Sequence, residues 1–121
     1  MAGAARPNAL LEKRCVPCEG GMPTLTPEEI APLLAQIQGW QVKEGKKLEK
    51  RFRFGDFVQA VAFVNAITPV AEDEGHHPDL YVTWGAVRVS LWTHAVGGLT
   101  ENDFILAAKI DRVFDQQPGK K

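Results

Sequence analysis

The sequence predicts an α+β fold in which a four-stranded antiparallel sheet carries three helices on one face, in the order αββαββα. Two observations lead to this class. Two pairs of short alternating apolar and polar segments, each pair joined by a glycine-containing link, indicate β-hairpins, and helical apolar spacing occurs before, between and after them. With 121 residues and 45% hydrophobic residues the chain can form one core. We expect a flexible arm at 1–24, one domain at 25–116 and a tail at 117–121.

The first helix is predicted from a capping signature. The hydroxyl of Thr26 can accept an N–H of the first turn, and Glu29, three residues on, can reach back to the N–H of Thr26. Pro32 argues against an undistorted first turn. The apolar residues that follow lie on one helical face: Ile30, Leu33, Leu34 and Ile37.

The first hairpin is predicted at residues 40–43 and 48–54, around Glu44-Gly45. Its second strand places three apolar side chains on one face: Leu48, Phe52 and Phe54. Asp56 then offers a helix N-cap for a broad apolar stripe. Pro69 interrupts that stripe, so the helix either stops there or continues with a kink towards Gly75.

The second hairpin is predicted at residues 79–84 and 87–94, linked by Gly85-Ala86, and Thr100 caps the last helix. One alternating set of the second strand faces the helices. Large side chains from the two strands are then left for the free face of the sheet: Tyr81 from the first strand, and Arg88 and Trp92 from the second. Open sheet edges together with exposed aromatic residues favour pairing with another copy, so we expect a homo-oligomer.

Charge and composition exclude some classes of function. The formal net charge of −1 gives no indication of nucleic-acid binding. No apolar run is long enough for a membrane span or a signal peptide, which predicts no membrane partner and a cytoplasmic protein. Cys15 and Cys18 form a CxxC pair, a spacing that can bind zinc or undergo redox cycling. Because it lies in a Pro/Gly-rich arm, a reduced pair of minor structural importance is the favoured interpretation.

The three histidines of the chain fall in two loops that we expect to be neighbours. His76 and His77 follow the central helix, and His94 ends the second hairpin. If the helix persists, Glu72 lies one turn before His76 and can orient its ring, as in an acid–base site. The alternative interpretation is that the histidines only end the helix, where the helix dipole favours them. Zinc is a third interpretation, but adjacent histidines point in different directions and rarely bind one ion.

At these residues the chain resembles the pterin-4a-carbinolamine dehydratases, also known as dimerisation cofactors of a homeodomain transcription factor. The family signature is an acidic residue, His-His-Pro after three intervening residues, an aromatic after five further residues, another His after nine further residues, and then an Asp. In this sequence the matching residues are Glu72, His76, His77, Pro78, Trp84, His94 and Asp103. The likeness extends from about Leu25 to Phe114 and includes the Gly-Leu-Thr run at 98–100.

The resemblance implies a homodimer or homotetramer that dehydrates 4a-hydroxytetrahydropterin to quinonoid dihydropterin, supporting tetrahydrobiopterin recycling without a metal or an organic cofactor. It implies that His76 and His94 are the acid and base and that His77 orients the pterin. Glu72 would hold His76. Asp103 would either hold the His94 loop or satisfy the N-terminus of the last helix.

Three further residues are expected at the substrate site: Pro78, Trp84 and Thr93. Two departures from animal members affect expected substrate contacts, since Leu80 stands where an aromatic is common and Val96 where Cys is common. The alternative function is a non-catalytic binding module, because relatives act as transcription coactivators or RuBisCO assembly factors. The retained histidines favour the enzyme.

Overall fold

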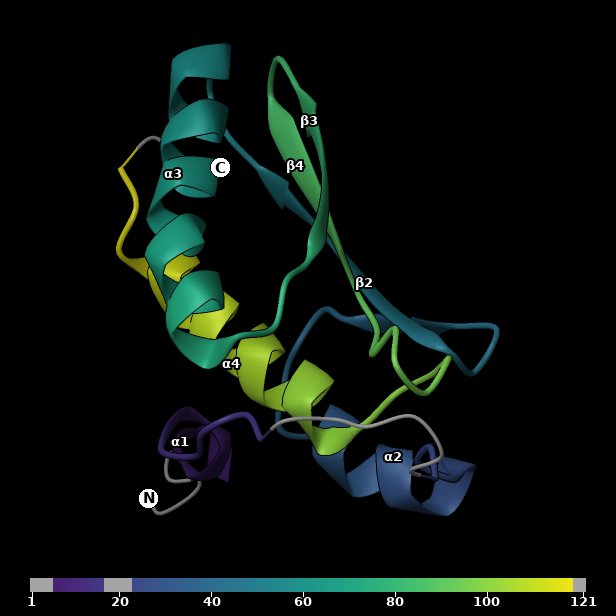
Figure 1. Ribbon diagram of the computed structural model, residues 1–121. Coiled ribbons are helices and arrows are strands. Elements are labelled where there is room, and N and C mark those ends of the chain that lie inside the picture. Colours follow the sequence, from purple (N-terminus) through teal and green to yellow (C-terminus); the bar gives the residue numbers. More distant parts are fainter. Residues whose placement is uncertain (1–5, 17–22, 119–121) are drawn as a thin grey trace.

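A four-stranded antiparallel sheet forms the centre of the protein, as expected. The computed structural model describes residues 6–16 and 23–118 (Figure 1). The strands are β1 (Gln41–Lys43), β2 (Lys47–Arg53), β3 (Asp79–Thr83) and β4 (Ala86–Leu91), and the helices are α1 (Arg6–Leu11), α2 (Pro27–Leu34), α3 (Phe57–Glu74) and α4 (Glu101–Asp115). The sheet order is β1-β2-β4-β3. The predicted α+β class is therefore confirmed.

The core lies between the sheet and the long helices α3 and α4. In the central pair of strands, Leu48 is opposite Leu91 and Phe52 is opposite Val87, and all four side chains are buried. Phe52 also packs on Phe63 of α3, with ring centroids 4.9 Å apart. The other face of the sheet is exposed at Tyr81 and Arg88, where the guanidinium lies 4.1 Å from the ring centroid. The expected homo-oligomer stays a prediction.

The structure has one helix more than the sequence predicts. Helix α1 lies within the segment expected to be a flexible arm, and its Leu10 is 1% exposed and belongs to the core. Just beyond it, Lys13 forms an ion pair with Glu101 at the start of α4, at 2.6 Å. A helix of six residues is too short to show a convincing apolar periodicity, so its packing on the domain had no signal in the sequence.

The two expected helix caps at α2 and α3 are confirmed. Glu29 N–H donates to the Thr26 hydroxyl at 3.2 Å, and Thr26 N–H donates to the Glu29 carboxylate at 2.9 Å. At α3, the Asp56 carboxylate accepts the N–H of Gln59 at 2.9 Å. Helix α3 runs past Pro69, so the second of the two alternatives for that proline, continuation of the helix, is the one observed.

The end of α3 determines where the histidines lie. Gly75 adopts a left-handed conformation with φ of 65°, and His76 N–H donates back to the Ala71 carbonyl at 3.2 Å. This is the usual way in which a helix is terminated at a glycine. His76 therefore lies outside the helix, and the chain leaves it in a new direction towards β3.

Replacing Gly75 by Ala is expected to lower the free energy of unfolding by about 1 kcal/mol, because a side chain is strained in the left-handed region. A Cβ at this position would have no atom within 4 Å, so the loss would come from the backbone alone. Chemical denaturation would measure it, with Gly75→Asn as the matched variant, since Asn tolerates this conformation better. Equal losses for Ala and Asn would contradict this explanation.

The second hairpin turns one residue earlier than predicted. Thr83 pairs with Ala86, so the loop is Trp84-Gly85. Strand β4 ends at Leu91, and the chain then forms a loop closed by the N–H of Thr93, which donates to the Gly98 carbonyl at 2.8 Å. His94 consequently lies in this loop and not at the end of a strand. In the described part of the chain no helix is long and apolar enough to cross a membrane, and the expected cytoplasmic location stays a prediction.

Candidate active site

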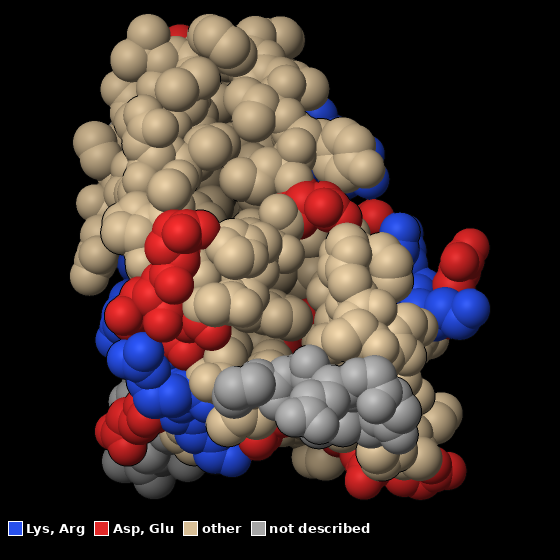
Figure 2. Space-filling model, viewed as in Figure 1, with Lys and Arg blue, Asp and Glu red and all other residues tan. Residues whose placement is uncertain are grey.

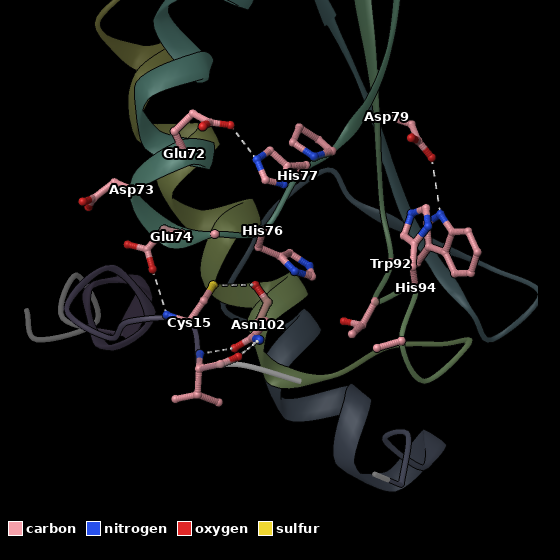
Figure 3. A pocket seen from close by; sticks show the side chains of 15 residues that line it. Cys15, Glu72, Asp73, Glu74, His76, His77, Asp79, Trp92, His94 and Asn102 are labelled. Atoms are coloured by element: carbon pink, nitrogen blue, oxygen red, sulfur yellow. Dashed lines mark hydrogen bonds and ion pairs between the residues drawn. The ribbon is translucent and has the colours of Figure 1, made fainter. Parts of the chain in front are cut away.

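A cavity of about 630 Å³ opens where the end of α3, the loop after β4, the start of α4 and the N-terminal segment meet (Figure 3). All three histidines line it. In Figure 3, His76 and His77 lie on the stretch that leaves α3, while Trp92 and His94 lie across the cavity from them. The expectation that the two histidine loops are neighbours is confirmed. Figure 2 shows Asp and Glu side chains on two sides of the middle of this face.

His76 is held by a buried carboxylate. Its Nε2 lies 2.6 Å from Asp103 Oδ1, and the two side chains are 11% and 0% exposed. A carboxylate only accepts hydrogen bonds, so Nε2 carries the proton in this pair and Nδ1 is the nitrogen left to exchange one. This arrangement fixes both the ring orientation and its tautomer.

Asp103 is itself fixed by two donors. Its second oxygen, Oδ2, accepts the Thr93 hydroxyl at 2.8 Å and the Thr100 N–H at 3.0 Å. Asp103 thus plays both roles expected of it, since Thr93 belongs to the His94 loop and Thr100 precedes α4. The sequence did not predict its third contact, with His76. Thr93 lines the cavity, and its expected place at the substrate site stays a prediction.

The predicted pairing of Glu72 with His76 is wrong. Glu72 Oε2 instead lies 2.6 Å from His77 Nε2, and this second pair is exposed, at 69% and 61%. The prediction assumed that the helix continues to His76, whereas Gly75 ends it and turns His76 away. Each of the two adjacent histidines therefore has its own carboxylate, one buried and one at the rim.

His94 has an aromatic neighbour. Its ring is stacked on Trp92, with centroids 3.9 Å apart and an interplanar angle of 27°. The indole N–H of Trp92 donates to Asp79 at 3.3 Å, which ties this stack to the first residue of β3. The structure places His94 at an exposed position on the cavity, where solvent can exchange protons with it.

Of the other expected substrate-site residues, Pro78 lines the cavity and Trp84 does not. Trp84 lies in the β3–β4 loop and is 74% exposed. The sequence suggested a pocket wall because the position belongs to the family signature, but within one chain the hairpin carries this side chain away from the histidines.

Cys15 and Val16 form a wall of the cavity that no pattern in the sequence indicated. Cys15 donates its backbone N–H to Glu74 at 2.8 Å, and Val16 donates its own to Asn102 at 3.0 Å. Burial, followed by the charge of Glu74, raises the pKa of the Cys15 thiol to about 12, which makes a poor nucleophile of it. Cys18, the other half of the CxxC pair, lies outside the described residues.

The comparisons with known proteins decide the family. Residues 23–113 match the family model described as pterin 4 alpha carbinolamine dehydratase. The chain belongs to this family. This agrees with the resemblance carried by Glu72, by the His-His-Pro run at 76–78 and by His94.

Several relatives of this dehydratase family are close in sequence. A protein of Rickettsia canadensis (strain McKiel) is 54% identical over 103 residues, covering 84% of this chain and 94% of the relative. One from Rubrobacter xylanophilus is 46% identical, covering 86% and 97%. Both carry the name pterin-4-alpha-carbinolamine dehydratase as a provisional assignment.

Two solved structures of dehydratase-like proteins are also similar. A transcriptional coactivator/pterin dehydratase from Brucella melitensis is 33% identical with a TM-score of 0.71, covering 75% of this chain and 98% of its own. A pterin dehydratase-like protein identified as a RuBisCO assembly factor in the alpha-carboxysome is 26% identical with a TM-score of 0.55, covering 64% and 94%. These neighbours therefore include both a dehydratase and an assembly factor.

The donor set at this dehydratase-family site suits proton transfer. Among residues 6–16 and 23–118, no group of three or more His, Cys, Asp or Glu side chains is placed to hold a metal ion. Each of the two carboxylate partners of the histidines occupies an Nε2 atom. Each imidazole has a second ring nitrogen that can accept or donate a proton, which is the requirement for a general acid and base.

Proposed function

We propose that the protein is a 4a-hydroxytetrahydropterin dehydratase that works by histidine general acid–base catalysis. In this reaction the ring nitrogen next to C4a loses its proton, its electron pair forms the C=N bond, and the C4a–O bond breaks. The departing hydroxyl takes up a proton and leaves as water, so the products are quinonoid dihydropterin and water. No electrons are exchanged with a second substrate, and two positioned proton carriers are sufficient.

The observation that carries the proposal is the convergence of His76, His77 and His94 on one cavity, with Asp103 behind His76. We assign the base to His76, because Asp103 holds the proton on Nε2, leaves Nδ1 as an acceptor and balances the charge that the ring gains. We assign the acid to His94, which is exposed and can recover its proton from water. His77, together with Glu72, would orient the pterin at the rim.

Stopped-flow absorbance of 4a-hydroxytetrahydropterin decay tests this function. We expect the wild-type protein to accelerate the decay and His94→Ala to lose about 10²-fold in kcat, the usual contribution of one acid–base group. His77→Ala is the comparison variant, and because His77 is exposed at the rim we expect its main effect on KM. Circular dichroism would verify that both variants fold.

The same experiment distinguishes the alternative function. No acceleration by folded wild-type protein would contradict the dehydratase and favour a non-catalytic binding module, the class that the assembly-factor relative represents. Full activity of His94→Ala would overturn the assignment of the acid while leaving the reaction in place.

A further inference from the structure

The dehydration mechanism leaves one wall of the cavity unused. We call residues 14–16 the N-terminal strap. They cross from the end of α3 to the start of α4, and Cys15 and Val16 line the cavity together with Asn102 (Figure 3). Val16 is 59% exposed, so the cavity wall at this position includes an apolar residue that is open to solvent.

The side-chain amide of Asn102 binds the backbone of the strap through two hydrogen bonds to Val16. The Asn102 amide accepts the N–H of Val16 at 3.0 Å and donates its own N–H to the Val16 carbonyl at 2.7 Å. The Cys15 thiol adds a weak hydrogen bond to the backbone carbonyl of Asn102, at 3.5 Å. Asn102 is 5% exposed, so these contacts are shielded from water.

The strap is bound to α3 through Glu74. One oxygen of Glu74 accepts the N–H of Cys15, and the other pairs with the buried Lys109 of α4. On the surface, Arg14 pairs with Asp73 at 3.2 Å and donates to its carbonyl at 3.1 Å. Two buried side chains and one exposed ion pair thus fix a backbone segment that belongs to neither helix.

These anchors adjoin the catalytic residues in the chain. Asn102 precedes Asp103, and Glu74 lies two residues before His76. Each of the two segments that deliver the His76–Asp103 pair to the cavity therefore also binds the strap. The position of the strap relative to the histidines is set by the same helix ends, which is what a substrate-binding wall requires.

We propose that the N-terminal strap is the wall against which the bound pterin packs, and that Asn102 and Glu74 are positioning residues that set the affinity for the pterin. This inference rests on the proposed function. Contact with the strap is made equally in the ground state and the transition state, so its loss raises KM while kcat, set by His76 and His94, stays the same.

The kinetic test is Asn102→Ala. Loss of the two hydrogen bonds to Val16 is expected to raise KM for 4a-hydroxytetrahydropterin about 10-fold and to leave kcat within about two-fold. Lys13→Ala is the matched control, because it removes a contact between the same N-terminal segment and α4, its exposed ion pair with Glu101, away from the cavity. A fall in kcat at unchanged KM would overturn the proposal, since it would mean that only Asp103 had been disturbed.

A second test does not depend on turnover. In the Cys18→Ser variant, Cys15 is the only thiol of the chain. Because the contacts of the strap keep Cys15 partly buried and its pKa is raised to about 12, its alkylation should be slow at mildly alkaline pH. We expect Asn102→Ala to speed alkylation at least about 10-fold and 7,8-dihydrobiopterin to slow it in the Cys18→Ser protein. Lys13→Ala should leave the rate unchanged.

The outcomes separate the strap from the reaction. Protection of Cys15 by 7,8-dihydrobiopterin without any dehydratase activity would overturn the proposed function and support the strap as a pterin wall. Dehydratase activity with no protection of Cys15, at a 7,8-dihydrobiopterin concentration that inhibits turnover, would overturn the strap proposal alone.

Discussion

Asp103→Asn is expected to lower kcat for 4a-hydroxytetrahydropterin dehydration about 10²- to 10⁴-fold, the range of a general acid–base group. Asn has nearly the same shape as Asp, and its carbonyl oxygen can still accept from Thr93 and Thr100. Its NH₂ group would then face His76, and a donor there forces Nε2 to become an acceptor. The proton moves to Nδ1, and the ring can no longer accept one from the substrate.

A double-mutant cycle measures whether the pair acts as a unit. His76→Ala is expected to lower kcat by a similar factor, and the double variant should be no slower than the slower single variant, because both changes remove one function. Thr93→Val is the matched control, since it removes one donor to Asp103 without reversing the tautomer of His76, and should have a smaller effect. Additive losses in the double variant would show that Asp103 acts on catalysis independently of His76.

Lys109→Met is expected to lower the free energy of unfolding by about 3 kcal/mol, because it leaves the Glu74 carboxylate buried without its main partner. The side chains of Lys109 and Glu74 are only 9% and 2% exposed, so water cannot replace the missing charge. The remaining ion-pair partner of Glu74 is the exposed Arg14, at 3.6 Å. Urea denaturation would measure the loss.

A compensating variant separates charge from packing. Glu74→Gln in the Lys109→Met background removes the unpaired charge and keeps an oxygen for the Cys15 N–H, so most of the lost stability should return. Lys13→Ala breaks an ion pair whose side chains are 51% and 44% exposed and should cost under about 1 kcal/mol. If the double variant were as unstable as Lys109→Met, packing of the lysine side chain would be the cause.

The same pair predicts the direction of the pH dependence. Burial raises the pKa of Glu74, but the hydrogen bonds from Lys109 and the Cys15 N–H and the charge of Lys109 outweigh burial and hold this pKa below its ordinary 4.5. A carboxyl with a lowered pKa stabilises the fold fully above about pH 4.5 and loses that contribution as the pH falls through its folded value. In Lys109→Met burial remains without the main lowering cause, so the pKa of Glu74 should rise. Protonation then removes the unpaired buried charge, and the stability deficit of this variant relative to the wild type should shrink as the pH falls.

Local patterns in the sequence were sufficient for the sheet, three of the helices and the approximate position of the site. Alternation in the first hairpin placed Leu48, Phe52 and Phe54 on one face, and all three are buried. The caps at Thr26 and Asp56 marked two helix starts. These signals involve residues close together in the chain, so the sequence alone shows them. Helix α1 was not predicted, because six residues are too few to show the spacing of apolar residues that indicates a helix.

The chain by itself also determined that its three histidines converge, since they lie in loops at the ends of adjoining elements. Only the tertiary structure decided their partners. His76 meets Asp103, 27 residues away, because the left-handed Gly75 turns it off the helix, and Glu72 is thereby left to His77. The position of the strap could not be predicted from the sequence either. Its contacts with Glu74 and Asn102 span 59 and 86 residues, and spacing in the sequence carries no information about side chains that the fold brings together over such separations.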